Sequence, residues 1–128
     1  MNITLSLLPD KLAICRLPPD TGIPKWASGG GILSITRTND ELSIVCAEAD
    51  VPEEVRSDRG WRCLQVAGPL DLALTGVLAS LANPLAAARI NIFAVSTFDT
   101  DYLLVKEENL ARSIDVLIRS GHRVNGIE

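Results

Sequence analysis

The sequence predicts an α+β fold, and three observations carry this prediction. Two segments repeat their apolar residues at the three- and four-residue intervals that define one helix face. Several shorter segments alternate apolar with polar residues or are rich in branched side chains, which is typical of β-strands. In the second half of the chain these segments follow the order strand, helix, strand, strand, helix, strand.

The first half of the chain is predicted to contain strands and turns without a long helix. Residues 18–31 are rich in proline and glycine, which leaves no room for a long helix. Pro9-Asp10 is expected to form a turn, so its flanking segments form either a hairpin or one bent strand, and Asn39-Asp40 joins the next pair. The polar residues 51–60 are the best candidate for a boundary between two halves. The predicted strands are residues 3–7, 12–17, 32–38 and 42–47.

The second half carries both predicted helices. The apolar face of the first helix consists of Leu74, Val77, Leu78, Leu81, Ala82 and Leu85. Pro84 lies inside this pattern and removes one backbone hydrogen bond, so a kink is expected near residues 80–83. The second helix is expected to begin at Glu107-Glu108, whose carboxylates suit the positive end of a helix dipole, and to stop at Gly121. Its buried stripe is Leu110, Ile114, Leu117 and Ile118. With strands at 61–67, 90–96, 101–105 and 123–127, this order is the split βαβ, ferredoxin-like arrangement.

Composition and charge exclude several classes of function. The chain has 128 residues, which suggests one compact domain or two very small ones, and 47% of them are apolar against 4% aromatic, so the core must be aliphatic. A net charge of −4 with scattered arginines argues against a nucleic-acid surface. The N-terminal residues have no basic start and no long apolar core, so we do not expect them to be a signal peptide, and no apolar run reaches the roughly 18 residues of a membrane helix. Three separated cysteines without a CxxC pair indicate reduced thiols, so we expect a soluble cytoplasmic protein.

The chain resembles itself at an offset of about 60 residues. This offset brings residues 34–45 onto residues 94–105, with their hydrophobic positions in common. Two unrelated β-hairpins could match in this way by chance. The alternative is a tandem repeat of one module whose first copy is degenerate. On that reading, residues 1–56 form a degenerate N-terminal half and residues 57–128 form the complete C-terminal module.

Several stretches of the second half resemble one known family. They are residues 74–81, Pro84-Leu85-Ala86, Ile90-Asn91-Ile92 and, most specifically, the STFDTDYLLV run at 96–105. Together they resemble the ACT domain, and more narrowly the CASTOR-like branch of tandem ACT proteins, whose animal members are cytosolic arginine sensors. The resemblance covers residues 61–121 well and residues 32–54 weakly. It implies a ferredoxin-like βαββαβ ACT fold in tandem with a degenerate N-terminal ACT-like half. It also implies an amino acid bound between modules, and two copies of this shorter chain would have to meet as a homodimer to rebuild such a site.

The predicted ligand site combines a helix start with an acidic loop. The carboxylate of a free amino acid suits the unpaired N–H groups at a helix N-terminus, and its ammonium group suits Asp99 or Asp101. Each residue has a plainer reading: Gly76 could be a packing residue, the loop could be a solvated turn, and Asn91 could be structural. Asp71 is a weaker candidate that could only cap the helix. The resemblance favours Asp101, Thr97 and Phe98 as site residues. The full prediction is Leu74, Thr75, Gly76, Val77, Asn91, Thr97, Phe98, Asp99 and Asp101.

The sequence predicts no enzyme, no cofactor and no metal site. His122 is the only histidine, so a histidine-based triad or metal centre would have to depend on it alone. No P-loop, GxGxxG or HExxH motif is present. The expected function is an amino-acid-binding regulatory sensor that acts on a protein partner, with arginine or another amino acid as ligand. The alternative is a structural or interaction module that binds no ligand and docks on a partner.

Overall fold

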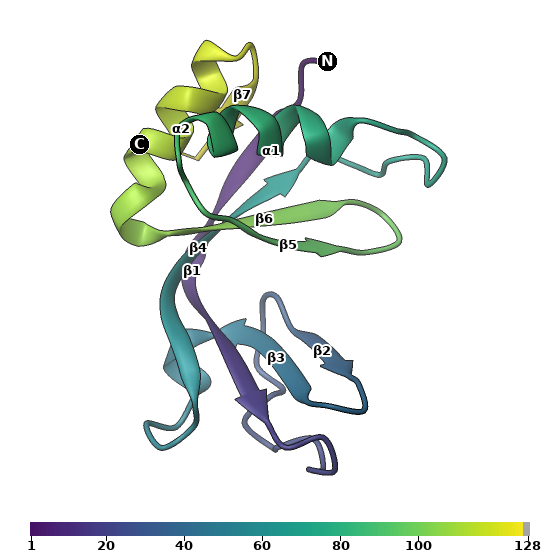
Figure 1. Cartoon of the computed structure of the whole chain (residues 1–128), viewed down its shortest axis with the longest axis vertical. Coiled ribbons are helices and arrows are strands. Elements are labelled where there is room, and N and C mark those ends of the chain that lie inside the picture. Colours follow the sequence, from purple (N-terminus) through teal and green to yellow (C-terminus); the bar gives the residue numbers. More distant parts are fainter. Residues whose placement is uncertain (127–128) are drawn as a thin grey trace. The chain divides into compact units, whose positions relative to one another are not determined.

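The computed structural model describes residues 1–126, arranged as seven strands, two α-helices and two short 3₁₀-helices (Figure 1). Their contacts form two compact units, one from residues 10–61 and the other from residues 1–9 with the described residues after 61. The elements are β1 (Thr4–Leu17), β2 (Ser34–Arg37), β3 (Leu42–Ala47), η1 (Glu48–Asp50), β4 (Ser57–Val66), α1 (Val77–Ala87), β5 (Phe93–Ser96), β6 (Asp101–Lys106), η2 (Glu107–Asn109), α2 (Leu110–Arg119) and β7 (Arg123–Asn125).

The C-terminal unit has the predicted βαββαβ order, so the α+β, ferredoxin-like prediction is confirmed. Its strands run in the order β1-β4-β6-β5, and β7 pairs in parallel with the first residues of β1, Thr4 opposite Arg123. β5 and β6 form an antiparallel hairpin in which Ser96 lies opposite Asp101. The predicted last strand ended at Ile127, which lies outside the described residues.

One aliphatic core joins the strands of this unit to its two helices. The buried members of the core are Leu5, Leu64, Val66, Val77, Leu81, Leu85, Ile90, Leu103, Val105, Leu117 and Val124. The three from α1 recur every four residues, which confirms the predicted helix face. The helix begins three residues later than its apolar pattern suggested. Gly76 has φ 84°, a left-handed conformation that a helix cannot include, so Leu74 remains in the preceding loop.

Helix α1 continues through Pro84, and the lone histidine compensates for the hydrogen bond that the proline removes. Pro84 has no N–H to donate to the carbonyl of Ser80, and His122 Nε2 lies 3.0 Å from that oxygen instead. The other ring nitrogen, Nδ1, accepts the N–H of Ile3 at 3.0 Å. An accepting Nδ1 requires the proton on Nε2, which donates to Ser80. His122 is therefore a buried structural residue that joins α1 to the residue before β1.

Both helices end in the same backbone motif. At the end of α1 the N–H of Ile90 bonds the carbonyl of Leu85, and at the end of α2 the N–H of His122 bonds the carbonyl of Leu117. These six-residue closures are Schellman motifs, which need a left-handed residue just past the helix. Gly121 supplies it with φ 95°, confirming the predicted stop, whereas Arg89 adopts φ 60° without being a glycine.

The N-terminal unit is a small antiparallel structure. All of residues 10–61 are described, and they contain strands and one 3₁₀-helix but no α-helix. β3 lies between β2 and β1, with Leu12 opposite Ala47. The turn predicted at Pro9-Asp10 is wrong, and of the two arrangements left open, the single strand is correct. Pro9 falls between the segment of β1 that pairs with β7 and the segment that pairs with β3, where its missing N–H interrupts neither pairing.

The internal resemblance has a counterpart in the structure. At an offset of 59 residues, close to the offset of about 60 in the sequence, β2, β3 and η1 fall on β5, β6 and η2 with identical bounds. The two hairpin turns also share their hydrogen bonds. The N–H of Thr38 donates to the carbonyl of Glu41 at 2.9 Å, and the N–H of Thr97 donates to that of Thr100 at 2.9 Å. In each turn the threonine hydroxyl also accepts the N–H three residues on.

The contacts divide the chain differently from the predicted domains 1–56 and 57–128. Residues 1–9 pack with the C-terminal unit because the start of β1 pairs with β7, and β4 already begins at Ser57 within the segment proposed as a boundary. The domain boundaries thus stay a prediction. Among the described residues, no helix is long and apolar enough to cross a membrane.

Candidate functional site

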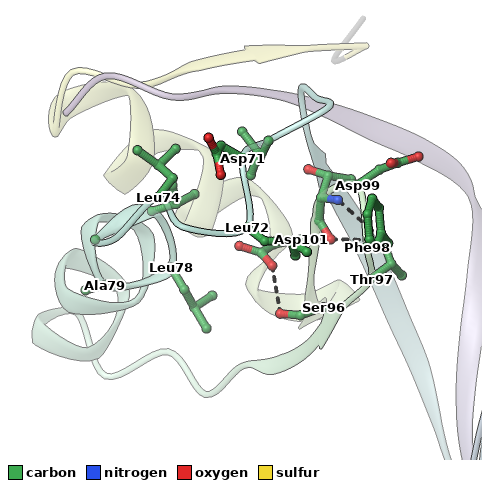
Figure 2. A pocket seen from close by; sticks show the side chains of 14 residues that line it. Asp71, Leu72, Leu74, Leu78, Ala79, Ser96, Thr97, Phe98, Asp99 and Asp101 are labelled. Carbon is green, nitrogen blue, oxygen red and sulfur yellow. Dashed lines mark hydrogen bonds between the residues drawn. The ribbon is translucent and has the colours of Figure 1, made fainter.

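The C-terminal unit contains a cavity of about 310 Å³ between the start of α1, the loop before it and the β5–β6 turn. Figure 2 shows the side chains that surround it. This volume lies at the lower end of the range, about 300 to 1,000 Å³, in which proteins bind small molecules. The lining residues are Leu70, Asp71, Leu72, Leu74, Gly76, Val77, Leu78, Ala79, Ser96, Thr97, Phe98, Asp99, Thr100 and Asp101.

The β5–β6 turn is held in place from both ends. Thr97 Oγ1 donates to the carbonyl of Thr100 at 3.0 Å, which closes the turn locally. Thr100 is 4% exposed, and its hydroxyl donates to the carbonyl of Val66 on β4 at 2.7 Å. The carbonyl of Asp99 accepts the N–H of Leu70 at 2.6 Å, which ties the turn to the loop before α1. The turn is therefore a fixed wall of the cavity.

The start of α1 presents unpaired backbone donors to the same cavity. Gly76 is the N-cap and makes no side-chain capping bond, and the first helical bond runs from the N–H of Ser80 to the carbonyl of Gly76. The N–H groups of Val77, Leu78 and Ala79 therefore have no partner within the helix, and all three residues line the cavity. An added Cβ on Gly76 would meet no atom within 4 Å, so the packing role considered for this glycine is wrong.

The charged groups of the cavity are all carboxylates. Asp71, Asp99 and Asp101 line it, and no Lys, Arg or His does. Asp101 Oδ1 accepts the hydroxyl of Ser96 at 2.7 Å, a bond visible in Figure 2, and Oδ2 has no partner among the described residues. Helix N–H donors and a positioned carboxylate thus lie around one small space. That pair of groups complements a molecule carrying both a carboxylate and an ammonium group.

The structure brings seven of the nine predicted site residues together around this cavity. They are Leu74, Gly76, Val77, Thr97, Phe98, Asp99 and Asp101. Thr75 is exposed and does not line the cavity, although it adjoins Gly76. Asn91 is exposed and precedes β5, so it lies at the end of that strand opposite the turn. That any of these residues binds a ligand remains a prediction.

Several lining residues were not among the predicted site residues. Leu70 and Leu72 belong to a loop without periodicity, so no pattern distinguished them. Asp71 was a weaker candidate as a helix cap, but its Oδ1 accepts the N–H of Ala73 at 2.8 Å within the loop. Thr100 could have been suspected from its place between two predicted site residues. The missed set is Leu70, Asp71, Leu72, Leu78, Ala79, Ser96 and Thr100.

Three large apolar side chains at the cavity are exposed to solvent. Phe98 is 78% exposed, Leu72 is 68% exposed and Leu74 is 48% exposed. Scattered exposed apolar residues are ordinary on protein surfaces, and these three are distinguished by lining the same cavity. We call these three residues the apolar rim.

The remaining reactive groups lie away from the cavity. All three cysteines are buried and free, and burial raises the pKa of Cys63 to about 12 and that of Cys46 to about 11. Such thiols stay protonated and unreactive near neutral pH. In the part of the chain that the structure describes, no group of three His, Cys, Asp or Glu side chains is arranged to hold a metal ion.

The fold and the cavity define a small α+β domain of the ligand-binding type, with its cavity at the junction of the first helix and a strand hairpin. The chain belongs to the ACT domain family, whose model matches residues 56–119. A second family model, described as an N-terminal domain, matches residues 10–54.

Individual relatives extend the comparison. The chain is 31% identical over 113 residues to the mouse protein named cytosolic arginine sensor for mTORC1 subunit 1, a match that covers 76% of this chain but only 34% of that protein. A crystal structure of an Agobacterium tumefaciens protein is 45% identical, with a TM-score of 0.92 over 97% of this chain and 92% of that one. Clostridium acetobutylicum aspartate kinase shares the fold alone, with 9% identity and a TM-score of 0.64 over 88% of this chain and 33% of that one.

Proposed function

We propose that this chain is a regulatory protein that binds a free amino acid in the cavity at the start of α1. The observation that carries the proposal is the unpaired N–H groups of Val77, Leu78 and Ala79 beside the carboxylate of Asp101. The ligand carboxylate accepts from the helix N–H groups, where the dipole also favours negative charge. The ligand ammonium group donates to Asp101, whose position is fixed by Ser96.

The charge of the lining favours a ligand with a basic side chain. Asp71 and Asp99 supply two further carboxylates, and no cationic side chain of the lining offsets them. An acidic side chain would meet repulsion there, whereas an ammonium or guanidinium group would be attracted. The name of the mouse relative, an arginine sensor, supports the same choice. We therefore propose arginine as the first ligand to test.

A second module is proposed to close the cavity. The apolar rim is exposed, and the match to the mouse relative covers only 34% of that protein, so we propose that a second copy of this chain supplies the further module. The N-terminal unit is proposed to be a degenerate ACT-like half, supported by its hairpin and turn equivalent to those of the C-terminal unit. In the turn of the N-terminal unit, Arg16 Nη2 donates a hydrogen bond to the carbonyl of Asp40 at 2.9 Å. A side chain of the protein itself therefore contacts the turn at this position. We assign the ligand to the C-terminal unit and propose a homodimer.

The proposed mechanism is a difference in affinity rather than a catalysed reaction. A ligand that bridges two modules stabilises the arrangement in which both contact it, and a protein partner that prefers one arrangement reads this change. The buried free thiols and the cytosolic relative support a cytoplasmic location.

A thermal-shift screen of the twenty free amino acids tests the proposal. A ligand that binds only the folded state at one hundred times its Kd stabilises it by about 2.7 kcal/mol, which raises the melting temperature. We expect the basic amino acids to raise it and the acidic ones to leave it unchanged. The shift should disappear in Asp101→Asn and persist in the control Asp115→Asn, whose carboxylate pairs with Arg119 on the exposed surface of α2. No shift with any amino acid at millimolar concentration would refute the proposal.

The apolar rim also favours a second function, a module that docks on a protein partner without a ligand. Exposed Phe98, Leu72 and Leu74 could contact the partner directly. This alternative predicts that Asp101→Asn leaves partner binding intact and that Phe98→Ser abolishes it. Partner binding that depends on an added amino acid and on Asp101 would exclude the alternative.

A further inference from the structure

A second cavity lies on the other side of the β5–β6 turn. It has a volume of about 330 Å³ and is lined by Gln65, Gly68, Pro69, Asp99, Thr100 and Tyr102. Only Asp99 and Thr100 also line the first cavity. The turn therefore separates two spaces, and the proposed amino-acid site accounts for only one of them.

Strand alternation places this second cavity on the sheet face away from the helices. Successive residues of a strand point to opposite faces. Leu64 and Val66 of β4 belong to the core beneath the helices, so Gln65 between them points to the other face. Tyr102 of β6 precedes Leu103, which belongs to the same core, so Tyr102 also points away from it. The two cavities thus open on different faces of the unit.

The second cavity is lined by polar groups, and the only charged one is a carboxylate. Gln65 Nε2 donates to the hydroxyl of Tyr102 at 3.5 Å, which leaves Gln65 Oε1 as an acceptor. Asp99 contributes a carboxylate, and the hydroxyl of Thr100 is already used on Val66. No Lys, Arg or His lines this space. The Tyr102 hydroxyl and the second N–H of Gln65 Nε2 can also donate. The only charge of the lining is the Asp99 carboxylate, which repels an anion and attracts a cation that carries N–H donors.

We infer that this second cavity binds a small organic cation with N–H donors, of the amine or guanidine class. Asp99 and Gln65 Oε1 accept its N–H groups, and Pro69 with the ring of Tyr102 supplies apolar surface for its carbon atoms. The two sites share Asp99, but the second uses neither the N–H groups of α1 nor Asp101. The inference therefore does not depend on the proposed function.

Nuclear magnetic resonance on the full chain tests the inference, with methylguanidinium as the probe and neutral methylurea as the control for charge. We expect methylguanidinium to shift the side-chain amide of Gln65 and the backbone amide of Tyr102 saturably, and methylurea to leave both unchanged. The shift at Tyr102 should persist in Asp101→Asn, which alters only the first cavity. It should need at least tenfold more probe in Gln65→Leu and in Tyr102→Phe, each first shown to be folded by its melting temperature.

Two kinds of result would overturn the inference. One is the absence of a saturable shift at Gln65 and Tyr102 in the unaltered chain. The other is binding that Gln65→Leu and Tyr102→Phe leave unchanged, that methylurea reproduces, or that Asp101→Asn abolishes. Binding at the proposed amino-acid site would instead shift the backbone amides of Val77 to Ala79. The absence of those shifts can therefore be distinguished from the absence of shifts at Gln65 and Tyr102.

Discussion

Replacing His122 by alanine should destabilise the protein through two specific hydrogen bonds. The imidazole is 6% exposed and connects the N–H of Ile3 to the carbonyl of Ser80, each at 3.0 Å. Leaving a buried polar group without its partner costs about 1 to 3 kcal/mol. Because two groups lose their partner and both lie at the edge of the core, we expect a total loss of about 2 to 4 kcal/mol in the free energy of unfolding.

Because His122 compensates for the N–H that Pro84 lacks, the two residues should be energetically coupled. In Pro84→Ala the restored N–H can donate to the carbonyl of Ser80, so His122→Ala should cost about 1 kcal/mol less in that background than in the unaltered chain. Urea denaturation at neutral pH measures all four free energies of this double-mutant cycle. Ser120→Ala is the matched control, because Ser120 bonds a helix carbonyl at the same end of α2 but is exposed. A loss below about 0.5 kcal/mol for His122→Ala, or no coupling to Pro84, would refute the reasoning.

Three further predictions concern the core, the turn and the thiols. Leu81→Ala, at a fully buried position, should cost about 2 to 5 kcal/mol in urea denaturation, and Leu72→Ala, at a position 68% exposed, less than about 0.5 kcal/mol; equal costs would contradict the assigned core. Thr100→Val removes the hydroxyl that bonds Val66 and should cost about 1 to 2 kcal/mol by the same assay, while Thr75→Val should cost almost nothing. Burial raises the pKa of Cys63 from 9.0 to about 12, so its contribution to stability is complete below pH 9 and is lost as the pH rises toward 12. Unfolding free energies measured at pH 8 and pH 10.5 should therefore differ less in Cys63→Ala than in the unaltered chain, and an equal difference would refute this.

Much of the C-terminal unit was predictable because its elements obey strong periodicity. The four-residue spacing of Val77, Leu81 and Leu85 identified the face of α1 that is buried. Gly121 identified the end of α2 because a Schellman motif needs a left-handed residue there. These are local rules, in which a few neighbouring residues decide the conformation.

Features that depend on distant residues were not predictable. Pro9 reads as a turn residue locally, yet β1 continues through it because two different partner strands pair on either side. Nothing near His122 indicates that its ring compensates for a proline 38 positions earlier. The sequence could suggest only that the histidine is isolated.

The site was predicted only in part, because one wall follows from the local sequence and the other depends on a contact between distant residues. The β5–β6 turn was predictable because polar residues and an aromatic ring follow a strongly apolar segment. Five of the lining residues form that turn or follow it directly. The opposite wall, Leu70 to Leu72, belongs to a loop whose course is set by the N–H of Leu70 bonding the carbonyl of Asp99. A bond between residues this far apart has no local sequence signature.

The central claim is that an amino acid binds between the start of α1 and Asp101, and calorimetric titration with L-arginine tests it most directly. We expect saturable binding to the unaltered chain, at least tenfold weaker binding to Asp101→Asn, and unchanged binding to Asp115→Asn. A tenfold change corresponds to about 1.4 kcal/mol, a modest share of the cost of removing one charge from a hydrogen-bonded pair. Equal affinity of the unaltered chain and Asp101→Asn for arginine would show that Asp101 does not hold the ligand.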